Sequence, residues 1–466
     1  MELDIATEES PKKDAILFIC MPLRHHHKNA YVVSVNMGYG HERAAYGLRD
    51  LAAGGIITAN DYPSIPKKDK NLWTDSRRIY ETISRLKPLP VLGDALFEVL
   101  DRMQRIPQFY PRRDLSKPSL QVHQTYYFIE HLGLCKHLIG MLAKKPKPLI
   151  CTFFIPAFAA EAFEYPGDIY LVICDADMSR AWVPKDPKRS RIKYFAPNGR
   201  VVERLKLYGV RPENIFLTGF PLPKELIGGP EAKIIKNDLV GRLCNLDPNG
   251  IFMDKYIKTL ETVLGPGTCP IRSNHPLTLT FAIGGAGAQK KLAGEILTSL
   301  KGPLLKNKLT LRLAAGTKRE IATFFFDEIK RVGVRSRLKK NLFVDWYQKR
   351  ATYFTEFSRI LRKTDILWTK PSELSFYTGA GIPIIMAPSI GSQEQFNRVW
   401  LKMVGGGVTQ NDPRCTDEWL FDWVNSGGLA RIAWNGYIEA PTHGSYRIES
   451  ILTGEKIDLE KIPMIV

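Results

Sequence analysis

The sequence has few cysteines, and none of them stands in a pattern that binds metal or builds a disulfide framework. Its 466 residues contain seven cysteines, an odd number, and no Cys-x-x-Cys pair. We therefore expect a reducing, cytoplasmic environment and no zinc site. The first residues, MELDIATEESPKKD, do not resemble a signal peptide. No run of about 18 apolar residues occurs, so we expect any membrane contact to be peripheral, on the inner face.

Acidic residues are also in the minority, with 48 Asp and Glu against 66 Lys and Arg and a formal net charge of +18. The positive charge is spread over both halves of the chain. This balance favours anionic partners such as nucleotide phosphates or an anionic membrane surface. No zinc motif or helix-turn-helix signature accompanies it, so a nucleic-acid partner is not expected. The length predicts two or three domains.

Short Val-, Ile-, Leu- and Phe-rich runs alternate with helical segments in both halves. The predicted strands span 15–23, 30–36, 148–154, 168–177, 192–196 and 214–218, with others within 277–300, at 309–316, at 340–346 and within 357–388. The predicted helices span 41–53, 122–143, 156–164 and 198–208, with others within 277–300 and 357–388 and after 416. This alternation predicts an α/β protein with two Rossmann-like parallel-sheet domains facing each other across a cleft.

Pro and Gly residues at 219–230 predict the linker between these domains. We expect an N-terminal acceptor domain at 1–225 and a C-terminal donor-binding domain at 226–466, with the last helices returning to the first domain. Residues 60–125 form an insertion rich in basic and aromatic residues. Such an insertion could contact an anionic membrane or could be a solvated segment with an aromatic core, and the sequence leaves both open.

Gly38, Tyr39, Gly40 and His41 occupy a predicted strand-to-helix turn. Glycines there either serve the turn alone or let backbone N–H groups approach an anionic ligand at the helix N-terminus. The imidazole of His41 can take a proton near neutral pH, which favours a functional site. Position 43 is Arg, so the motif is not a complete Gly-x-Gly-x-x-Gly. We expect His41 to be catalytic and the two glycines to lie on the acceptor side.

A second glycine-rich turn opens a helix in the second half. It consists of Gly284, Gly285, Ala286, Gly287 and Ala288. Three glycines in four residues after a buried strand favour a phosphate cradle over a plain turn. The turn lacks the Gly-Lys-Ser/Thr ending of a Walker loop, so ATP hydrolysis by that route is not supported.

Polar residues also follow the predicted strands within 357–388. Ser372 is placed to cap a helix that begins near Glu373. Amide and carboxylate groups just beyond the next strand suit the recognition of hydroxyls, as in a sugar, although a solvated turn has the same composition. These groups belong to Gln393, Glu394 and Asn397.

Asp175 and Asp177 form an Asp-x-Asp pair at the end of a predicted strand. Such pairs can hold a divalent metal on nucleotide phosphates. Here the pair lies in the first half, whereas the phosphate-type turn lies in the second. We therefore expect no metal and an acceptor-side or structural role for the two aspartates.

Taken in order, these segments resemble the two-domain glycosyltransferases of the GT-B fold. The resemblance rests on NMGYGHERAA, Thr218-Gly219-x-Pro221, FAIGGAGA and DILWTKPSELSFYTGAGIPIIMAP. It is greatest to monogalactosyldiacylglycerol synthase and to the peptidoglycan enzyme that adds N-acetylglucosamine to a lipid-linked precursor. It covers most of residues 30–405, and the region 60–125 matches no family that we can name.

The resemblance implies an inverting hexosyltransferase that uses a nucleotide-diphosphate sugar, with UDP as the expected nucleotide, and needs neither metal nor cofactor. The acceptor would be a hydroxyl, of a lipid or a lipid-linked molecule. The diphosphate would bind at 284–288, and His41 would be the general base or a donor contact. The nucleotide and sugar would bind Lys370, Ser372, Glu373, Gln393, Glu394 and Asn397.

One segment departs from the family pattern, which reads Lys-Pro-Gly-Gly-x-Thr with a ribose-binding Ser-Glu further on. Here Lys370-Pro371 is followed by Ser372-Glu373, and Phe376 occupies the register of that glutamate. Glu373 could supply the carboxylate from a different turn. A nucleotide-sugar 2-epimerase or hydrolase, for which no paired carboxylates stand out, and a non-catalytic nucleotide-sugar-binding protein are the alternative functions. The oligomeric state is not predicted.

Overall fold

The computed structural model describes residues 29–74, 106–266, 273–283, 289–389 and 391–459. The predicted strand at 15–23 and the glycine-rich turn at 284–288 lie outside these residues, as does part of the insertion. Within the described residues, no helix is both long enough and apolar enough to cross a bilayer.

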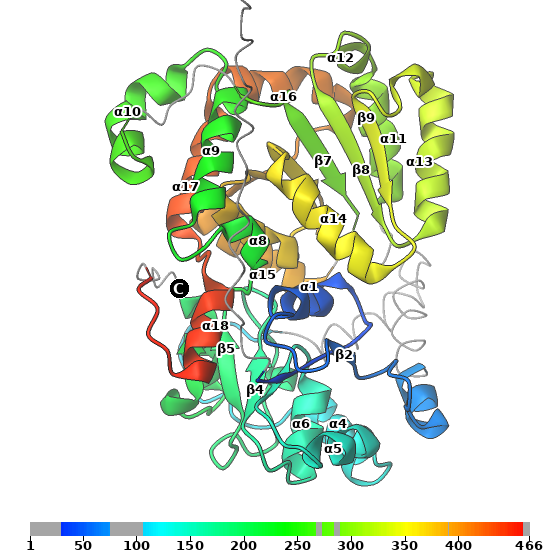
Figure 1. Ribbon diagram of the computed structural model, residues 1–466, viewed down its shortest axis with the longest axis vertical. Helices are drawn as coiled ribbons and strands as arrows, with labels where there is room; N and C mark the ends of the chain where they lie inside the picture. Colours follow the sequence, from blue (N-terminus) through cyan, green and yellow to red (C-terminus); the bar gives the residue numbers. More distant parts are fainter. Residues whose placement is uncertain (1–28, 75–105, 267–272, 284–288, 390, 460–466) are drawn as a thin grey trace, which may run out of the picture.

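Two six-stranded sheets, each with all strands parallel, form the two halves of the molecule (Figure 1). The first has the order β2-β1-β3-β4-β5-β6 and the second β12-β11-β10-β7-β8-β9. The first sheet contains β1 (Tyr31–Ser34), β2 (Ile57–Thr58), β3 (Leu149–Cys151), β4 (Ile169–Val172), β5 (Lys193–Ala196) and β6 (Ile215–Leu217). The second contains β7 (Thr278–Ala282), β8 (Thr310–Gly316), β9 (Leu342–Trp346), β10 (Ile366–Thr369), β11 (Ile384–Met386) and β12 (Gly407–Thr409). The predicted fold class is confirmed.

Both sheets are buried on both faces, because successive side chains of a strand point to opposite sides. In β10, Ile366 and Trp368 belong to one buried cluster and Leu367 to another. The same alternation occurs along β4 in the first half. The cluster that contains Leu367 extends across both halves, so the two sheets share a continuous apolar core.

Helices connect the strands, and their bounds correct the sequence prediction in places. The first half contains α1 (Tyr39–Gly47), α4 (Leu120–Glu130), α5 (Lys136–Ala143), α6 (Phe154–Ala162), α7 (Gly199–Leu207) and α8 (Lys224–Ile227). The second half contains α9 (Lys233–Leu246), α10 (Ile251–Leu264), α11 (Lys290–Ser299), α12 (Lys301–Leu305), α13 (Arg319–Val332), α14 (Arg350–Arg362), α15 (Ser392–Met403), α16 (Thr416–Asn425), α17 (Gly428–Glu439) and α18 (Gly444–Thr453). Short 3₁₀ helices occupy Arg180–Trp182, Pro212–Asn214, Arg335–Arg337, Glu373–Ala380 and Pro413–Cys415.

The single helix predicted at 122–143 is wrong, because the chain breaks it into α4 and α5. Gly133 has a φ of 73° and Cys135 a φ of 66°, both in the left-handed region. The N–H of Gly133 donates to the Ile129 carbonyl and that of Leu134 to the Phe128 carbonyl, which closes the end of α4. A glycine in this conformation is a common helix terminator. The helix predicted at 41–53 likewise ends early, at Gly47.

The last helix, α18, packs against the first half of the chain (Figure 1). The Ser445 hydroxyl donates to the Leu222 carbonyl, and Arg447 donates to the Thr218 carbonyl at 3.2 Å. Glycines allow this close packing around the crossing segment 218–222. A Cβ added to Gly444 would lie 2.2 Å from the Phe220 carbonyl oxygen, and one added to Gly47 would lie 1.9 Å from that of Pro221.

We predict that Gly47→Ala lowers the free energy of unfolding by roughly 1–3 kcal/mol, because its methyl group overlaps rigid backbone. Gly140→Ala is the matched control, since Gly140 is also helical and a Cβ there meets nothing within 4 Å. The control should stabilise by about 0.5–1 kcal/mol. Chemical denaturation measures the free energy of unfolding of both variants. Equal values would show that the backbone at 218–222 can shift to accommodate the added methyl group.

Candidate functional site

The carboxyl edges of the two sheets face each other, as contacts between the loops beyond them show. The Tyr39 hydroxyl of α1, which follows β1, accepts from the backbone N–H of Thr317, which follows β8, at 2.9 Å. The carboxylate of Glu373, beyond β10, pairs with Arg43 of α1. Open parallel sheets bind ligands outside these edges, at the point where the strand order reverses. In the second sheet that point lies between β7 and β10.

Arg43 is the central residue of this contact, and the sequence motif identified it only as an exception to the glycine pattern. Its Nε lies 3.0 Å from Glu373 Oε1, and its Nη2 donates to the Tyr353 hydroxyl at 2.6 Å. The guanidinium carbon lies 4.4 Å from the centre of the Phe357 ring. Tyr39 and Phe354 also present their rings to it. The side chain is only 3% exposed, so the charge is held between the halves and largely out of water.

Gly38 and Gly40 form the turn that starts α1. Gly38 has a φ of 136°, which a residue with a Cβ rarely adopts. A Cβ added to Gly40 would lie 3.4 Å from Glu373 Oε2. Such a distance is an ordinary van der Waals contact, so Gly40 places the start of α1 directly beside the Glu373 side chain of the other half.

His41 lies against the aromatic side chains that line the first half at this edge. Its ring centre is 4.9 Å from that of Phe153, which follows β3, and 5.7 Å from that of Trp182. Its Nδ1 is buried and has no hydrogen-bond partner within the described residues. Burial lowers the pKa of His41 to about 4, against opposing contributions from the backbone of Thr152 and the carboxylate of Glu373. The imidazole is therefore neutral at pH 7 and a weak base.

Asp175 and Asn397 join the two halves at the end of β4. Asn397 is fully buried on α15, and its Nδ2 donates to Asp175 Oδ1 at 2.9 Å. Its Oδ1 accepts from the backbone N–H of Ala176 at 2.7 Å. Burial raises the pKa of the Asp175 carboxyl to about 6. Two carboxylates, Glu373 and Glu394, add to this rise in pKa, and the Asn397 hydrogen bond opposes it.

Asp177, by contrast, is used inside the first half. Its carboxylate is fully buried, and it accepts from Arg204 at 2.8 and 2.9 Å and from Arg200 at 3.0 Å. It also accepts from the backbone N–H of Met178. These contacts engage both oxygens, so the geometry assigns Asp177 a structural role.

The remaining predicted donor residues lie beyond β10 and β11. Lys370 forms an ion pair with Glu394, in the first turn of α15 beside the half-buried Gln393. Ser372 precedes the 3₁₀ helix Glu373–Ala380, but its side chain makes no capping hydrogen bond, which corrects the predicted cap. Phe376, in the register of the family's glutamate, stacks on Phe220 with ring centres 5.0 Å apart. That position belongs to the core.

Gly284, Gly285, Ala286, Gly287 and Ala288 lie outside the described residues, and only their flanks can be placed. In the sequence they lie between β7 and α11. Gln289, at the start of α11, donates from Nε2 to the Pro388 carbonyl at 2.6 Å. Within the described residues, no group of three His, Cys, Asp or Glu side chains is placed to hold a metal ion.

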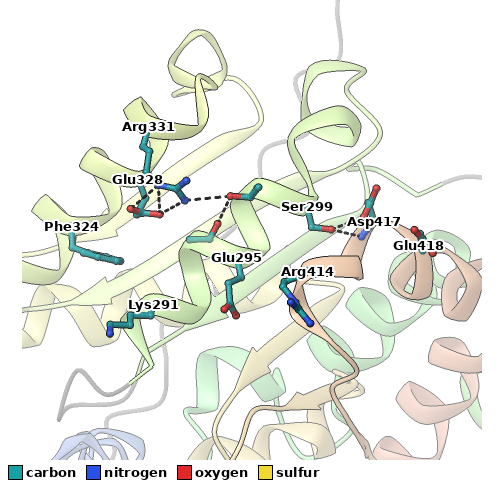
Figure 2. A pocket seen from close by; sticks show the side chains of 11 residues that line it. Lys291, Glu295, Ser299, Phe324, Glu328, Arg331, Arg414, Asp417 and Glu418 are labelled. Atoms are coloured by element: carbon teal, nitrogen blue, oxygen red, sulfur yellow. Dashed lines mark hydrogen bonds and ion pairs between the residues drawn. The ribbon is translucent and has the colours of Figure 1, made fainter.

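A separate hollow of about 700 Å³ lies on the outer side of the second half (Figure 2). Side chains of α11, α13 and α16 line it. Arg331 forms an ion pair with Glu328, and the Ser299 hydroxyl donates to Asp417. None of the predicted site residues lines this hollow, and several of its charges are already paired with each other.

No protein-family model matches the sequence, and no curated protein matches it. Solved structures of similar architecture exist. The UDP-GlcNAc 2-epimerase from Neisseria meningitidis bound to UDP-GlcNAc is 11% identical, with a TM-score of 0.45, over 78% of this chain and 88% of that one. Acinetobacter baumannii MurG is 10% identical, with a TM-score of 0.41, over 92% and 100%. WaaG, a glycosyltransferase involved in lipopolysaccharide biosynthesis, is 14% identical, with a TM-score of 0.37, over 70% and 82%.

The likeness to these structures is one of fold. The chain's own strand order establishes two Rossmann-like parallel sheets, and the contacts between the loops beyond them show that their carboxyl edges face each other. Sequence reasoning did not find Arg43 or the bridging role of Asn397. It also found no group of neighbouring carboxylates, whereas the structure brings Glu373 and Glu394 within electrostatic reach of Asp175.

We predict that Arg43→Met costs about 3–5 kcal/mol of unfolding free energy, because it leaves the Glu373 carboxylate without its buried partner. Arg43→Met combined with Glu373→Gln should lose less than the sum of the single variants, by about 0.5–3 kcal/mol. Arg414→Met is the control, since Arg414 forms an exposed pair with Asp412, and should change stability by at most about 0.5 kcal/mol. If chemical denaturation showed that the losses of the two single variants add up to that of the double variant, Arg43 and Glu373 would not be a coupled pair.

The low pKa of His41 predicts a pH dependence of stability. The pKa of His41 is lower in the folded protein, at about 4, than the ordinary histidine value of 6.5, so the unfolded chain binds more protons between these values. Stability is then fully present above pH 6.5 and is lost as the pH falls towards 4. Between pH 7 and pH 5, the free energy of unfolding of the wild-type protein should fall by about 2 kcal/mol more than that of the His41→Gln variant. If urea denaturation showed the unfolding free energies of the two proteins changing equally with pH, the burial of a neutral imidazole would be contradicted.

Proposed function

We propose that the protein is a glycosyltransferase that moves a sugar from a nucleotide-diphosphate sugar, with UDP-sugars as the first candidates, to a hydroxyl acceptor. The observation that carries the proposal is the meeting of the two carboxyl edges. The residues beyond β10, with Glu373, stand against the helix start that carries Gly40 and His41. In this proposal the donor binds at the strand-order reversal of the second sheet, and the acceptor approaches from the first.

The proposed donor site combines the turn at 284–288 with the polar groups beyond β10 and β11. Backbone N–H groups at a helix start stabilise a leaving diphosphate without a metal. Lys370 and Glu394 are partly exposed, at 20% and 12% of their side chains, and could take up sugar hydroxyls or phosphate oxygens. His41, neutral and partly buried, would contact the donor near its reacting carbon, with inversion as the expected outcome.

A lipid or lipid-linked acceptor at an anionic membrane surface forms part of the proposal. Large apolar side chains are exposed on α4 and α5, including Leu120, Tyr127 and Met141. Exposed basic residues include Lys136, on α5, and Lys144, which directly follows this helix. Apolar side chains together with Lys and Arg favour adsorption to anionic lipid surfaces.

A nucleotide-sugar 2-epimerase or hydrolase is the second candidate, and one observation favours it. Glu373 and Glu394 both act electrostatically on Asp175, and acid–base chemistry on a donor sugar needs such carboxylates. Incubation with UDP-GlcNAc in the absence of an acceptor separates the candidates. A transferase leaves the sugar isomer unchanged, whereas an epimerase produces a new isomer.

We predict that a UDP-sugar raises the melting temperature more than the corresponding GDP-, ADP- or TDP-sugar does. A ligand at a hundredfold excess over its dissociation constant contributes about 2.7 kcal/mol. The chosen donor is then tested for transfer to diacylglycerol in anionic phospholipid vesicles, with UDP release and the glycolipid product as readouts. A protein that no nucleotide sugar stabilises would refute the proposed function, and one that binds without turnover would be a binding protein.

A further inference from the structure

Asp175 lies where a hydrogen bond joins the two halves of the proposed site. It follows β4 of the first half, and its Oδ1 accepts from Asn397 of the second half at 2.9 Å. Asn397 is itself fixed, because it is fully buried and accepts from the Ala176 N–H at 2.7 Å. The orientation of the carboxylate is therefore set by two elements at once. Asp175 is nevertheless partly exposed, so the carboxylate is not sealed in the core.

Charged groups of the second half surround this carboxylate. Glu373 and Glu394 disfavour its ionisation, and Lys370 favours it. The neighbouring thiol of Cys174, in the first half, is neutral, because burial raises its pKa well above the usual range. Together with burial, these groups leave the pKa at about 6. A base with such a pKa is mostly ionised at pH 7 and still strong enough to accept a proton. The His41 imidazole, with a pKa of about 4, is a weaker base than the carboxylate.

We propose that Asp175 is the general base of the transfer reaction and accepts the proton of the acceptor hydroxyl, an inference that rests on the proposed function. The acceptor oxygen bonds to the anomeric carbon while the bond from that carbon to the phosphate oxygen breaks. The nucleoside diphosphate leaves with the electron pair of the broken bond. The hydroxyl proton passes to a carboxylate oxygen of Asp175, which returns it to water after the products leave.

This assignment predicts the pH profile of the reaction. Only the ionised carboxylate accepts a proton, so kcat/KM should rise with pH up to about 6 and be level above it. At pH 5 it should be about tenfold below its plateau. If His41 were the base, the plateau would extend down to about pH 4.

Variants of Asp175 provide the direct test, with UDP-sugar turnover as the assay. Asp175→Asn preserves the oxygen that accepts from Asn397, so the fold and the binding of UDP should be retained. We expect kcat to fall by about 100-fold or more, with the dissociation constant of UDP changed by less than about twofold. Asp168→Asn is the matched control, since Asp168 lies just before the same strand, is 55% exposed and pairs with Lys193. It should keep full activity.

Two further variants separate chemistry from structure. Asp175→Glu retains a titrating carboxylate and should keep partial activity with an acidic limb in its pH profile. Asn397→Ala removes the hydrogen bond that lowers the pKa of Asp175, so its acidic limb should move to higher pH. An Asp175→Asn variant that keeps more than about a tenth of the wild-type kcat overturns the proposal. So does an acidic limb that stays in place in Asn397→Ala.

Failure of the proposed function gives a different result. A wild-type protein that turns over no nucleotide sugar overturns the function, and the assignment of Asp175 falls with it. A wild-type protein that turns over a UDP-sugar together with an active Asp175→Asn overturns only the assignment of the base.

Discussion

The buried charge of Arg43 is the constraint on which the arrangement of the two halves depends. Its guanidinium is enclosed by Tyr39, Tyr353, Phe354 and Phe357, and such a charge is costly to bury without a partner. The partner is Glu373, 330 residues further along the chain and on the other half. Because the carboxylate must meet the guanidinium, the loop beyond β10 is held against the start of α1.

The positions of the other candidate residues follow from this contact. Glu373 lies beside Gly40, which brings the helix start of His41 next to the second half. A second tie between the halves, from Asn397 to Asp175 and Ala176, fixes the end of β4 in the same region. Candidate site residues from both halves thus lie together at the facing edges, and neither half alone contributes all of them. A reaction that joins a donor on one half to an acceptor on the other needs such a shared edge.

Much of the fold could be predicted because buried strands leave a plain signal in sequence. Runs such as 168–177 are apolar on both faces, and the turns beyond them contain Gly, Asn or Asp. The shortest edge strands, β2 with two residues and β12 with three, carry too little pattern to be recognised. The helix predicted at 122–143 failed because its apolar spacing continues past Gly133, and only the backbone conformation shows the break.

The site could be predicted less completely, because its decisive contacts join distant positions. The glycine turn, His41 and the polar residues beyond β10 are predicted from local motifs, and their roles stay predictions. No local sequence motif marked Arg43, because its role depends on aromatic rings and a carboxylate more than 300 residues away. Asn397 looked like a sugar-binding amide, and its hydrogen bonds across the halves appear only in three dimensions. The burial that sets the pKa values of His41 and Asp175 is also a property of the assembled molecule.

The return of α18 to the first half has a consequence for biosynthesis. Ser445 and Arg447 bond to carbonyls at 218–222, and Ile448 completes the apolar core that the halves share. During translation, the first half emerges from the ribosome more than 200 residues before this helix does. Until α18 is made, its docking surface on the first half stays uncovered, so the N-terminal half completes this packing only after the C-terminal half has been synthesised.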